Sequence, residues 1–317
     1  MSRVLLVCLI ASLAVAHGKA QSDSAAMLVE QLGSNSAAER ESAASRLREL
    51  GTQARVQLAK GCEHRNAQVR RTAFALLNRL PGTRYRAKRG ASIDSLTGLP
   101  KAIVHRASGC EMVLIPAGTY MRGAGPIDAM AEPRERPQKR AAVARPFYLG
   151  RCELTYGQWR AVMGPKKGVQ PEPATPVVDV SMDEIRSYLW RTGLRLPTET
   201  EWEFACRAGH RGARYGPMDK IAWYYKNSGN KLHDVGELRP NRFGLHDMIG
   251  NAFEFCGDVC LPDGKSRTPT SSTLPDRHAI RGGAFNYGLD WGRASARWPC
   301  EPGVHSPHIG FRVALDP

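Results

Sequence analysis

The sequence predicts a mixed α and β protein in which a short all-helical segment precedes a longer, loop-rich domain. Apolar residues recur at spacings of three and four through residues 24–80, which is the period of amphipathic helices. Residues 147–204 combine one strand pattern with capped helix patterns. From Gly209 onward, glycine, asparagine and proline are frequent and regular patterns are scarce. A loop-rich region of this length needs ions, disulfides or buried polar networks to hold it together.

Residues 1–20 have the pattern of a secretory signal peptide. Arg3 precedes an apolar run over residues 4–16, and Gly18 and Ala20 supply small residues at the expected cleavage region. The run is shorter than the ~20 apolar residues that a membrane span needs, so an uncleaved anchor is the weaker interpretation. We therefore expect an exported protein, periplasmic or secreted, with no transmembrane segment after cleavage.

The charge of the chain narrows the class of partner. Cleavage would remove Arg3 and Lys19 and lower the formal net charge from +15 to +13. An exported chain rarely meets nucleic acid, so we expect a protein or a polyanionic cell-envelope ligand, while a role in solubility alone stays open. Seven of the eight cysteines would remain, an odd number that leaves at least one thiol without a partner in the chain and does not fix any pairing.

Residues 21–82 predict a small helical module. Helix patterns end at Gly33, at Gly51 and at Pro81-Gly82, and Ser36 and Asn66 are candidate N-caps. Two similar helical pairs resemble HEAT-type repeats, but two repeats are fewer than a stable solenoid needs. We expect an interaction or packing module that leans on another part of the protein. Residues 83–109 are basic and lack periodicity, which predicts a linker.

The second domain is expected to span residues 110–317. A strand is expected at residues 147–155, followed by a helix over residues 156–163 that Thr155 caps. Ser181 with Glu184, and Thr198 with Glu201, have the spacing of capping boxes at the start of two more helices. The charge-dense segment 132–140 is expected to be a solvated loop.

Several blocks of this domain resemble one known family. They are Met112–Met121, Cys152–Thr155, Pro176–Ser181, Arg195–Phe204, Asn241–Phe255, Arg281–Phe285 and Gly310–Arg312. In this order they are similar to the formylglycine-generating enzyme family, also called the sulfatase-modifying factor family. The resemblance implies an α+β fold of the C-type-lectin-like kind, with little regular secondary structure.

The resemblance also implies a calcium site. The positions that match the family's calcium ligands are Asp247, Gly250, Ala252 and Glu254, which would supply two carboxylates and two backbone carbonyls. Oxygen ligands converging from a glycine-containing turn are what calcium prefers. The alternative is that the two carboxylates only accept hydrogen bonds from backbone amides or from an arginine.

The family's catalytic feature is a pair of cysteines that binds copper(I), and this chain lacks it. The matching positions are Tyr287 and Gly292, and neither can replace the thiolates that Cu(I) prefers. Copper is therefore not expected, and the catalytic residues are left unassigned. Two hypotheses stay open: a binding or accessory domain without cysteine oxidase activity, or an active oxidoreductase that makes formylglycine or a related oxidative modification.

Two further groups of residues are expected to be structural. Cys256 and Cys260 are the closely spaced cysteine pair, and a packing role is favoured over a metal or redox role. Three arginines of this domain are expected to be buried partners of Glu201, Glu203 or Glu254; they are Arg281, Arg297 and Arg312.

Overall fold

The computed structural model describes residues 24–77, 84–166, 171–260, 266–267 and 277–317. The chain divides into two compact units, Met1–Lys101 with Pro317 and Ala102–Asp316. The predicted signal peptide, residues 1–20, lies outside the described residues. Among the described residues, no helix has both the length and the apolar character that a membrane crossing requires.

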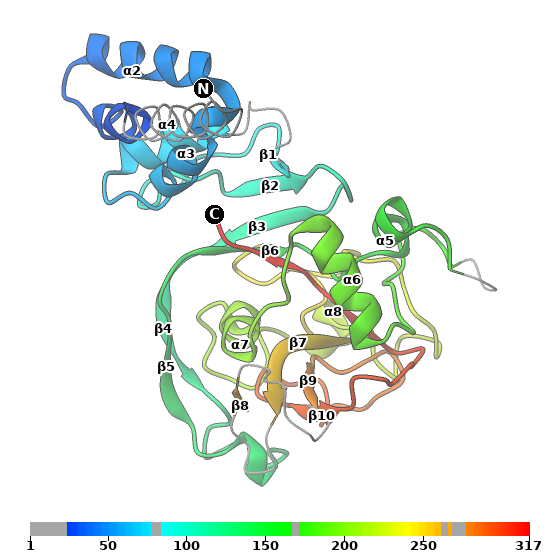
Figure 1. Ribbon diagram of the computed structural model, residues 1–317. Coiled ribbons are helices and arrows are strands. Elements are labelled where there is room, and N and C mark those ends of the chain that lie inside the picture. The colour runs from blue at the N-terminus through cyan, green and yellow to red at the C-terminus, as the bar shows by residue number, and fades with distance from the viewer. Residues whose placement is uncertain (1–23, 78–83, 167–170, 261–265, 268–276) are drawn as a thin grey trace, which may run out of the picture. The chain divides into compact units, whose positions relative to one another are not determined.

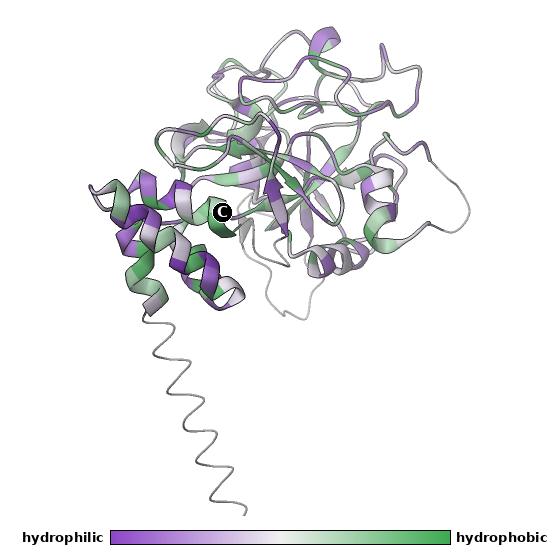
Figure 2. Ribbon diagram, turned by 90° about the horizontal axis from the view of Figure 1, so that it is seen from above, coloured by the Kyte–Doolittle hydropathy of each residue, from purple (hydrophilic) through white to green (hydrophobic). Residues whose placement is uncertain are grey.

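The first unit is mostly helical (Figure 1). Its elements are helical residues 24–31, α2 (Ala37–Leu50), the 3-10 helix η1 (Gly51–Ala54), α3 (Arg55–Gly61), α4 (Ala67–Leu77) and the short strand β1 (Tyr85–Ala87). Figure 2 shows hydrophobic and hydrophilic residues mixed along each helix, as amphipathic helices require. Leu32, Leu47 and Leu58 are fully buried. The predicted helices are confirmed, and the HEAT-like repeat stays a prediction.

Both predicted N-caps of this unit are confirmed. The Ser36 hydroxyl accepts a hydrogen bond from the backbone N–H of Glu39, and Asn66 Oδ1 accepts one from Gln68 at 2.8 Å. These bonds satisfy backbone donors that the first turn of a helix leaves free, so each helix begins where its cap stands.

The structure differs from the predicted linker over residues 83–109. The guanidinium of Arg70 in α4 donates hydrogen bonds to the carbonyls of Leu96 and Thr97, and Leu99 is 1% exposed. Farther along, Ala102–His105 form strand β2, in which Ile103 and His105 are buried. The buried residues of this segment are widely spaced among basic residues and show no periodic pattern. The ordered segment was therefore not predicted from the sequence.

The second unit contains one sheet built from β2, β3 (Glu111–Ile115), β6 (Phe147–Gly150) and β12 (Ala314–Leu315), all antiparallel neighbours in that order. Strand β6 stops at Gly150, short of the predicted end at residue 155. Strands β4 (Gly118–Arg122) and β5 (Lys139–Val143) form a separate antiparallel ribbon beside helix α7 (Glu199–Arg207) (Figure 1).

Three helices of this unit begin at the predicted caps. They are α5 (Tyr156–Met163) after Thr155, α6 (Met182–Thr192) after Ser181 and α7 (Glu199–Arg207) after Thr198. Each has a complete capping box, in which the cap side chain and the side chain at the third helical position bond each other's backbone N–H.

A second sheet follows the loop-rich region. Residues 209–252 are described throughout and contain one short helix, α8 (Met218–Ile221), and no strand. The sheet has the order β10-β9-β7-β11, with β8 beside β7 and β11 parallel to β7. Its strands are β7 (Phe253–Cys260), β8 (Ser266–Arg267), β9 (His278–Arg281), β10 (Trp298–Cys300) and β11 (Ile309–Phe311). The core of the unit includes Trp202, Phe147, Leu149 and Ile249.

Candidate functional site

The turn that carries the predicted calcium ligands is tightly built. Gly250 has a φ of +80°, and a Cβ there would lie 2.3 Å from the carbonyl oxygen of Trp223, so only glycine fits. Its N–H donates to the carbonyl of Gly282 at 3.0 Å. Asp247 and Asn251 also have positive φ values, 52° and 57°, in the left-handed region that Asp and Asn adopt more readily than other non-glycine residues.

Glu254, one of the predicted calcium ligands, is occupied by protein donors. Arg312 donates to both of its carboxylate oxygens, at 2.7 and 2.6 Å, and the indole N–H of Trp202 donates to one of them at 2.7 Å. All three side chains are completely buried. Hydrogen bonding to an arginine was the alternative role expected for this carboxylate from the sequence. Such an arginine is present.

Two more buried carboxylates lie beside this pair. Glu153 accepts hydrogen bonds from the Ala252 N–H at 3.0 Å and the Asn251 amide at 3.1 Å. Asp247 accepts one at Oδ2 from the Gly236 N–H at 2.7 Å, while its buried Oδ1 has no partner among the described residues. Burial and the charge of Asp247 raise the pKa of Glu153 well above its ordinary value. Burial likewise raises the pKa of Asp247 to about 6.

The calcium prediction can be tested against this geometry. Glu153, Asp247 and Glu254 are three buried carboxylates, and Arg312 is a buried cation that contacts the turn. The cluster of buried carboxyl groups and the unpartnered Asp247 Oδ1 fit a divalent cation. The carboxylate of Glu254 does not fit as it stands, because it would have to exchange Arg312 for the ion. Calcium at Asp247, Gly250, Ala252 and Glu254 stays a prediction.

The positions that match the family's copper cysteines are filled by packed groups. The Tyr287 hydroxyl lies 3.2 Å from His308 Nε2, and its ring packs edge-on against Phe253 and Trp291 with centroids 4.9 and 4.8 Å apart. A Cβ on Gly292 would lie 2.9 Å from Met218 Cε and 3.1 Å from Ile249 Cγ2. The residues present do not fit a copper thiolate site.

The cysteines of the described residues are free thiols, seven in all. Burial raises the pKa of Cys152 and of Cys206 to about 12, so both are neutral at physiological pH and poor metal ligands or nucleophiles. Cys256 and Cys260 lie on strand β7, and both are buried. Their surroundings favour the packing role.

Two of the three arginines have the carboxylate partners that were expected. Arg281 contacts Glu203 at 2.8 Å, and Arg312 contacts Glu254 as described. Arg297 instead pairs with Glu199, a residue outside the expected set. These pairs connect β9, β10 and β11 to α7 and β7, and their role is structural.

A further ion pair corrects the prediction that residues 132–140 are a solvated loop. The 3-10 helix η2 (Pro133–Glu135) buries Glu135, whose carboxylate contacts Arg293 and Ser295. Burial alone would raise the pKa of Glu135, but the hydrogen bonds from Arg293 and Ser295 outweigh burial and hold the pKa below its ordinary value. Sequence charge density gave no sign that one acid in this segment faces inward.

A shallow, open pocket near Tyr287 and Trp291 was not predicted from the sequence. Its lining residues come from the segment after β4, the segment after α8 and the 286–290 loop; they are Met130, Tyr225, Asn286, Gly288, Leu289 and Asp290. Met130 and Tyr225 are 49% and 53% exposed. Exposed apolar side chains around a concave surface are a feature of binding sites. The aromatic residues of the loop, Tyr287 and Trp291, are the sequence signal that was available.

Comparison with known proteins agrees with this fold. A family model described as a sulfatase-modifying factor enzyme 1-like domain matches residues 100–317. The formylglycine-generating enzyme of Thermomonospora curvata is 30% identical over 187 residues, which cover 50% of this chain and 61% of that protein. The inactive C-alpha-formylglycine-generating enzyme 2 of Mus musculus is 31% identical over 176 residues, or 49% of this chain and 54% of that protein.

A solved structure supports the same assignment. PvdO from Pseudomonas aeruginosa is 26% identical, with a TM-score of 0.61 over 68% of this chain and 98% of that one. The chain spans less than two thirds of the length of the two curated relatives. The α+β architecture is C-type-lectin-like, as the resemblance implied, and the chain belongs to the sulfatase-modifying factor (formylglycine-generating enzyme) family.

Proposed function

We propose that this protein is an exported, calcium-stabilised member of the family that lacks copper-dependent cysteine oxidation and acts as a binding or accessory domain. The observation that carries the proposal is the pair Tyr287 and Gly292 at the positions of the family's copper-binding cysteines. Copper(I) prefers soft thiolates, and a phenol and a glycine offer none. One relative, the mouse protein, is itself named as inactive.

The packing around these positions supports the proposal. The Tyr287 hydroxyl is bonded to His308, and its ring stands among aromatic residues. Gly292 packs against Met218 and Ile249, so a longer side chain would displace them. Here the chain's own residues fill the region with rings and methyl groups and offer no thiolate at either position.

The activity test uses a peptide that contains the sulfatase-type cysteine. The purified protein is incubated with the peptide, copper and oxygen, and the peptide mass is followed. The formylglycine-generating enzyme of Thermomonospora curvata serves as the positive control. We expect conversion by the control and none by this protein. Conversion of the peptide that depends on this protein would establish the alternative, an active oxidoreductase.

Calcium, in this proposal, has a structural role. Asp247 through its Oδ1 and the carbonyls of Gly250 and Ala252 would hold the ion, with Glu254 joining if it leaves Arg312. Bound there, calcium supplies positive charge to a region where three carboxylates are buried. Asp247 and Glu153 also accept hydrogen bonds from backbone N–H groups. These bonds hold the turn between the loop-rich region and strand β7.

The open pocket lined by Met130, Tyr225 and the 286–290 loop is the proposed partner surface. Its exposed apolar residues favour a protein partner over a polyanion at this place. A photo-crosslinking residue at position 225 should capture a protein from the exported fraction, whereas the same residue at the exposed Trp190 of α6 should not. Equal crosslinking from both positions would argue against this surface.

Export rests on residues 1–20 alone. Amino-terminal sequencing of the mature protein from its native host tests it. A mature chain that begins near residue 21 supports export, and a full-length chain in the cytoplasmic fraction contradicts it.

A further inference from the structure

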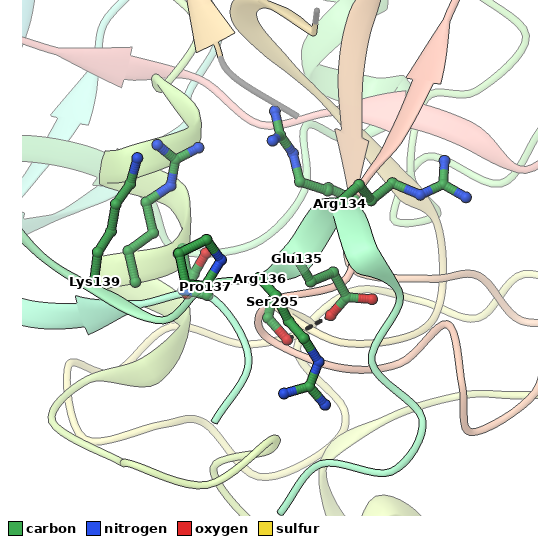
Figure 3. Close-up of a pocket in the computed structure, with 10 residues that line it drawn as sticks. Arg134, Glu135, Arg136, Pro137, Lys139 and Ser295 are labelled. Carbon is green, nitrogen blue, oxygen red and sulfur yellow. Dashed lines mark hydrogen bonds between the residues drawn. The ribbon is translucent and has the colours of Figure 1, made fainter. Parts of the chain in front are cut away.

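A second pocket, of about 170 Å³, lies within the second unit and is rich in positive charge. It is bordered by the segment between η2 and β5, by the end of β4, and by residues 295 and 297. Figure 3 shows Lys139 on one side of Pro137, with Arg134 and Glu135 on the other. Its five basic lining residues are Arg122, Arg134, Arg136, Lys139 and Arg297.

The two acidic lining residues do not neutralise these cations. Glu135 accepts two hydrogen bonds of 2.6 Å from Arg293, and Figure 3 shows its further bond to Ser295. Glu203 is held by Arg207 at 2.9 Å and by Arg281 at 2.8 Å. The three arginines that bind these acids are not among the lining residues. Each lining carboxylate is therefore matched with a cation that lies behind the pocket wall.

Two lining cations have no carboxylate partner within the described part of the chain. Among the ion pairs of the described residues, none includes Arg136 or Lys139. The guanidinium of Arg136 donates to the carbonyls of Gly125 and Asp128 at 3.1 and 2.8 Å. Carbonyl acceptors orient the group without cancelling its charge, so Arg136 is held in place as a cation that still attracts an anion.

The remaining cations of the wall are held by carboxylates and by close packing. Arg134 pairs with Glu132 and lies over the ring of Trp298, 5.7 Å from its centroid. Arg122 and Arg297 both contact Glu199. A Cβ on Gly123, whose φ is +93°, would lie 2.6 Å from the carbonyl oxygen of Glu135, so the backbone is packed closely here. A wall held in this way binds without first having to be ordered.

We propose that this pocket binds a tetrahedral, doubly charged oxyanion, with phosphate or a phosphate monoester as the ligand class. Two cations without carboxylate partners match two negative charges, and guanidinium groups suit the oxygens of such an anion. The volume is sufficient for the anion and several waters. The inference goes beyond the proposed function and does not depend on it, because no residue of the partner surface or of the turn at 247–254 lines this pocket.

The test is thermal unfolding of the full chain with increasing inorganic phosphate at about pH 8, where phosphate is largely a dianion. Sodium nitrate keeps the ionic strength constant. The wild type should show a melting temperature that rises and saturates with phosphate. Lys139→Gln should weaken the apparent affinity at least about tenfold, since one charge-assisted hydrogen bond is lost. Because Lys139 is exposed and makes no ion pair among the described residues, its loss should leave the phosphate-free melting temperature unchanged.

A matched control separates the pocket from the general charge of the protein. Arg136→Gln with Lys139→Gln removes two positive charges at the pocket. Arg211→Gln with Lys231→Gln removes two at exposed positions outside its lining. Loss of saturable binding in the first variant and its retention in the second support the proposal. Equal responses of the two variants, or equal stabilisation of the wild type by nitrate, would overturn it.

Two further ligands identify the source of the anion. Phenyl phosphate carries the same group on a larger molecule, and sulfate has the same shape and charge without the ester. Tighter binding of phenyl phosphate identifies a monoester on a larger ligand, and tighter binding of the inorganic ions identifies a free anion. Both outcomes support the site. Failure of all three to saturate contradicts it.

Discussion

Arg293 donates two hydrogen bonds of 2.6 Å to the carboxylate of Glu135, which stands 158 positions earlier in the chain. Both side chains are 1% exposed. The pair fixes the charged segment before β5 to the loop that follows β9. The basic pocket and the partner surface adjoin this ion pair, so loss of the pair should disturb both surfaces.

Glu135→Gln should destabilise the protein strongly, because it leaves the guanidinium of Arg293 buried with a weakened partner. Breaking a buried pair costs about 3–5 kcal/mol. The control is Glu301→Gln, whose partner Arg277 is as exposed as Glu301 itself, at 57%. That change should cost less than about 1 kcal/mol. Urea unfolding measures both, and equal costs would show that burial of the pair has little importance.

Gly292→Ala tests the packing at a position that matches a family cysteine. The added methyl group would meet Met218 and Ile249, and overpacking of this kind costs about 1–3 kcal/mol. Gly303→Ala is the control, because nothing lies within 4 Å of a Cβ there. Thermal unfolding should separate the two variants. A neutral Gly292→Ala would mean that the region accommodates a side chain and that the argument from packing fails.

Calcium should stabilise the folded protein if the ion binds at the 247–254 turn. At a hundred times its dissociation constant it should add about 2.7 kcal/mol, and a chelator should lower the melting temperature. Asp247→Asn should reduce the response, whereas Asp234→Asn, at an exposed position, should keep it. A melting curve that chelator leaves unchanged would favour the ion-free role, in which these carboxylates accept hydrogen bonds only.

The helical unit should fold best when it includes residues 84–101. Arg70 bonds to the carbonyls of Leu96 and Thr97, and Leu99 is buried, so a fragment of residues 24–101 contains contacts that a fragment of residues 24–81 lacks. We expect the longer fragment to show a sharper thermal transition, as measured by circular dichroism. Identical transitions would show that the helices alone form the cooperative unit.

Local signals in the sequence predicted local structure well. The cap at Thr155 and the capping boxes at Ser181 and Thr198 depend on residues close together in the sequence, so each could be predicted directly and each is confirmed. The fold followed from the resemblance of separated blocks, and the family match confirms it. Strand β2 was missed because a short strand among basic residues has no periodicity of its own.

Pairings between distant residues were harder to predict. The acidic partners of Arg281 and Arg312 were anticipated because all four residues lie inside the family blocks. Glu135 and Glu199 were not, since the first stands among charged neighbours and the second begins a helix, where an acid is expected on the surface. Which acid turns inward depends on a partner that only the tertiary structure brings near.

Arg312 follows β11 and contacts backbone carbonyls at Gly150, His246 and Asp247 as well as the carboxylate of Glu254. Four segments of the chain are therefore joined by one side chain near the end of the second unit. While a ribosome is still making residues 309–315, Glu254 is without its guanidinium and β6 and β7 each lack a neighbour strand. This unit cannot complete its folding before residues 309–315 have been made, and until then its unpaired strands are exposed to aggregation.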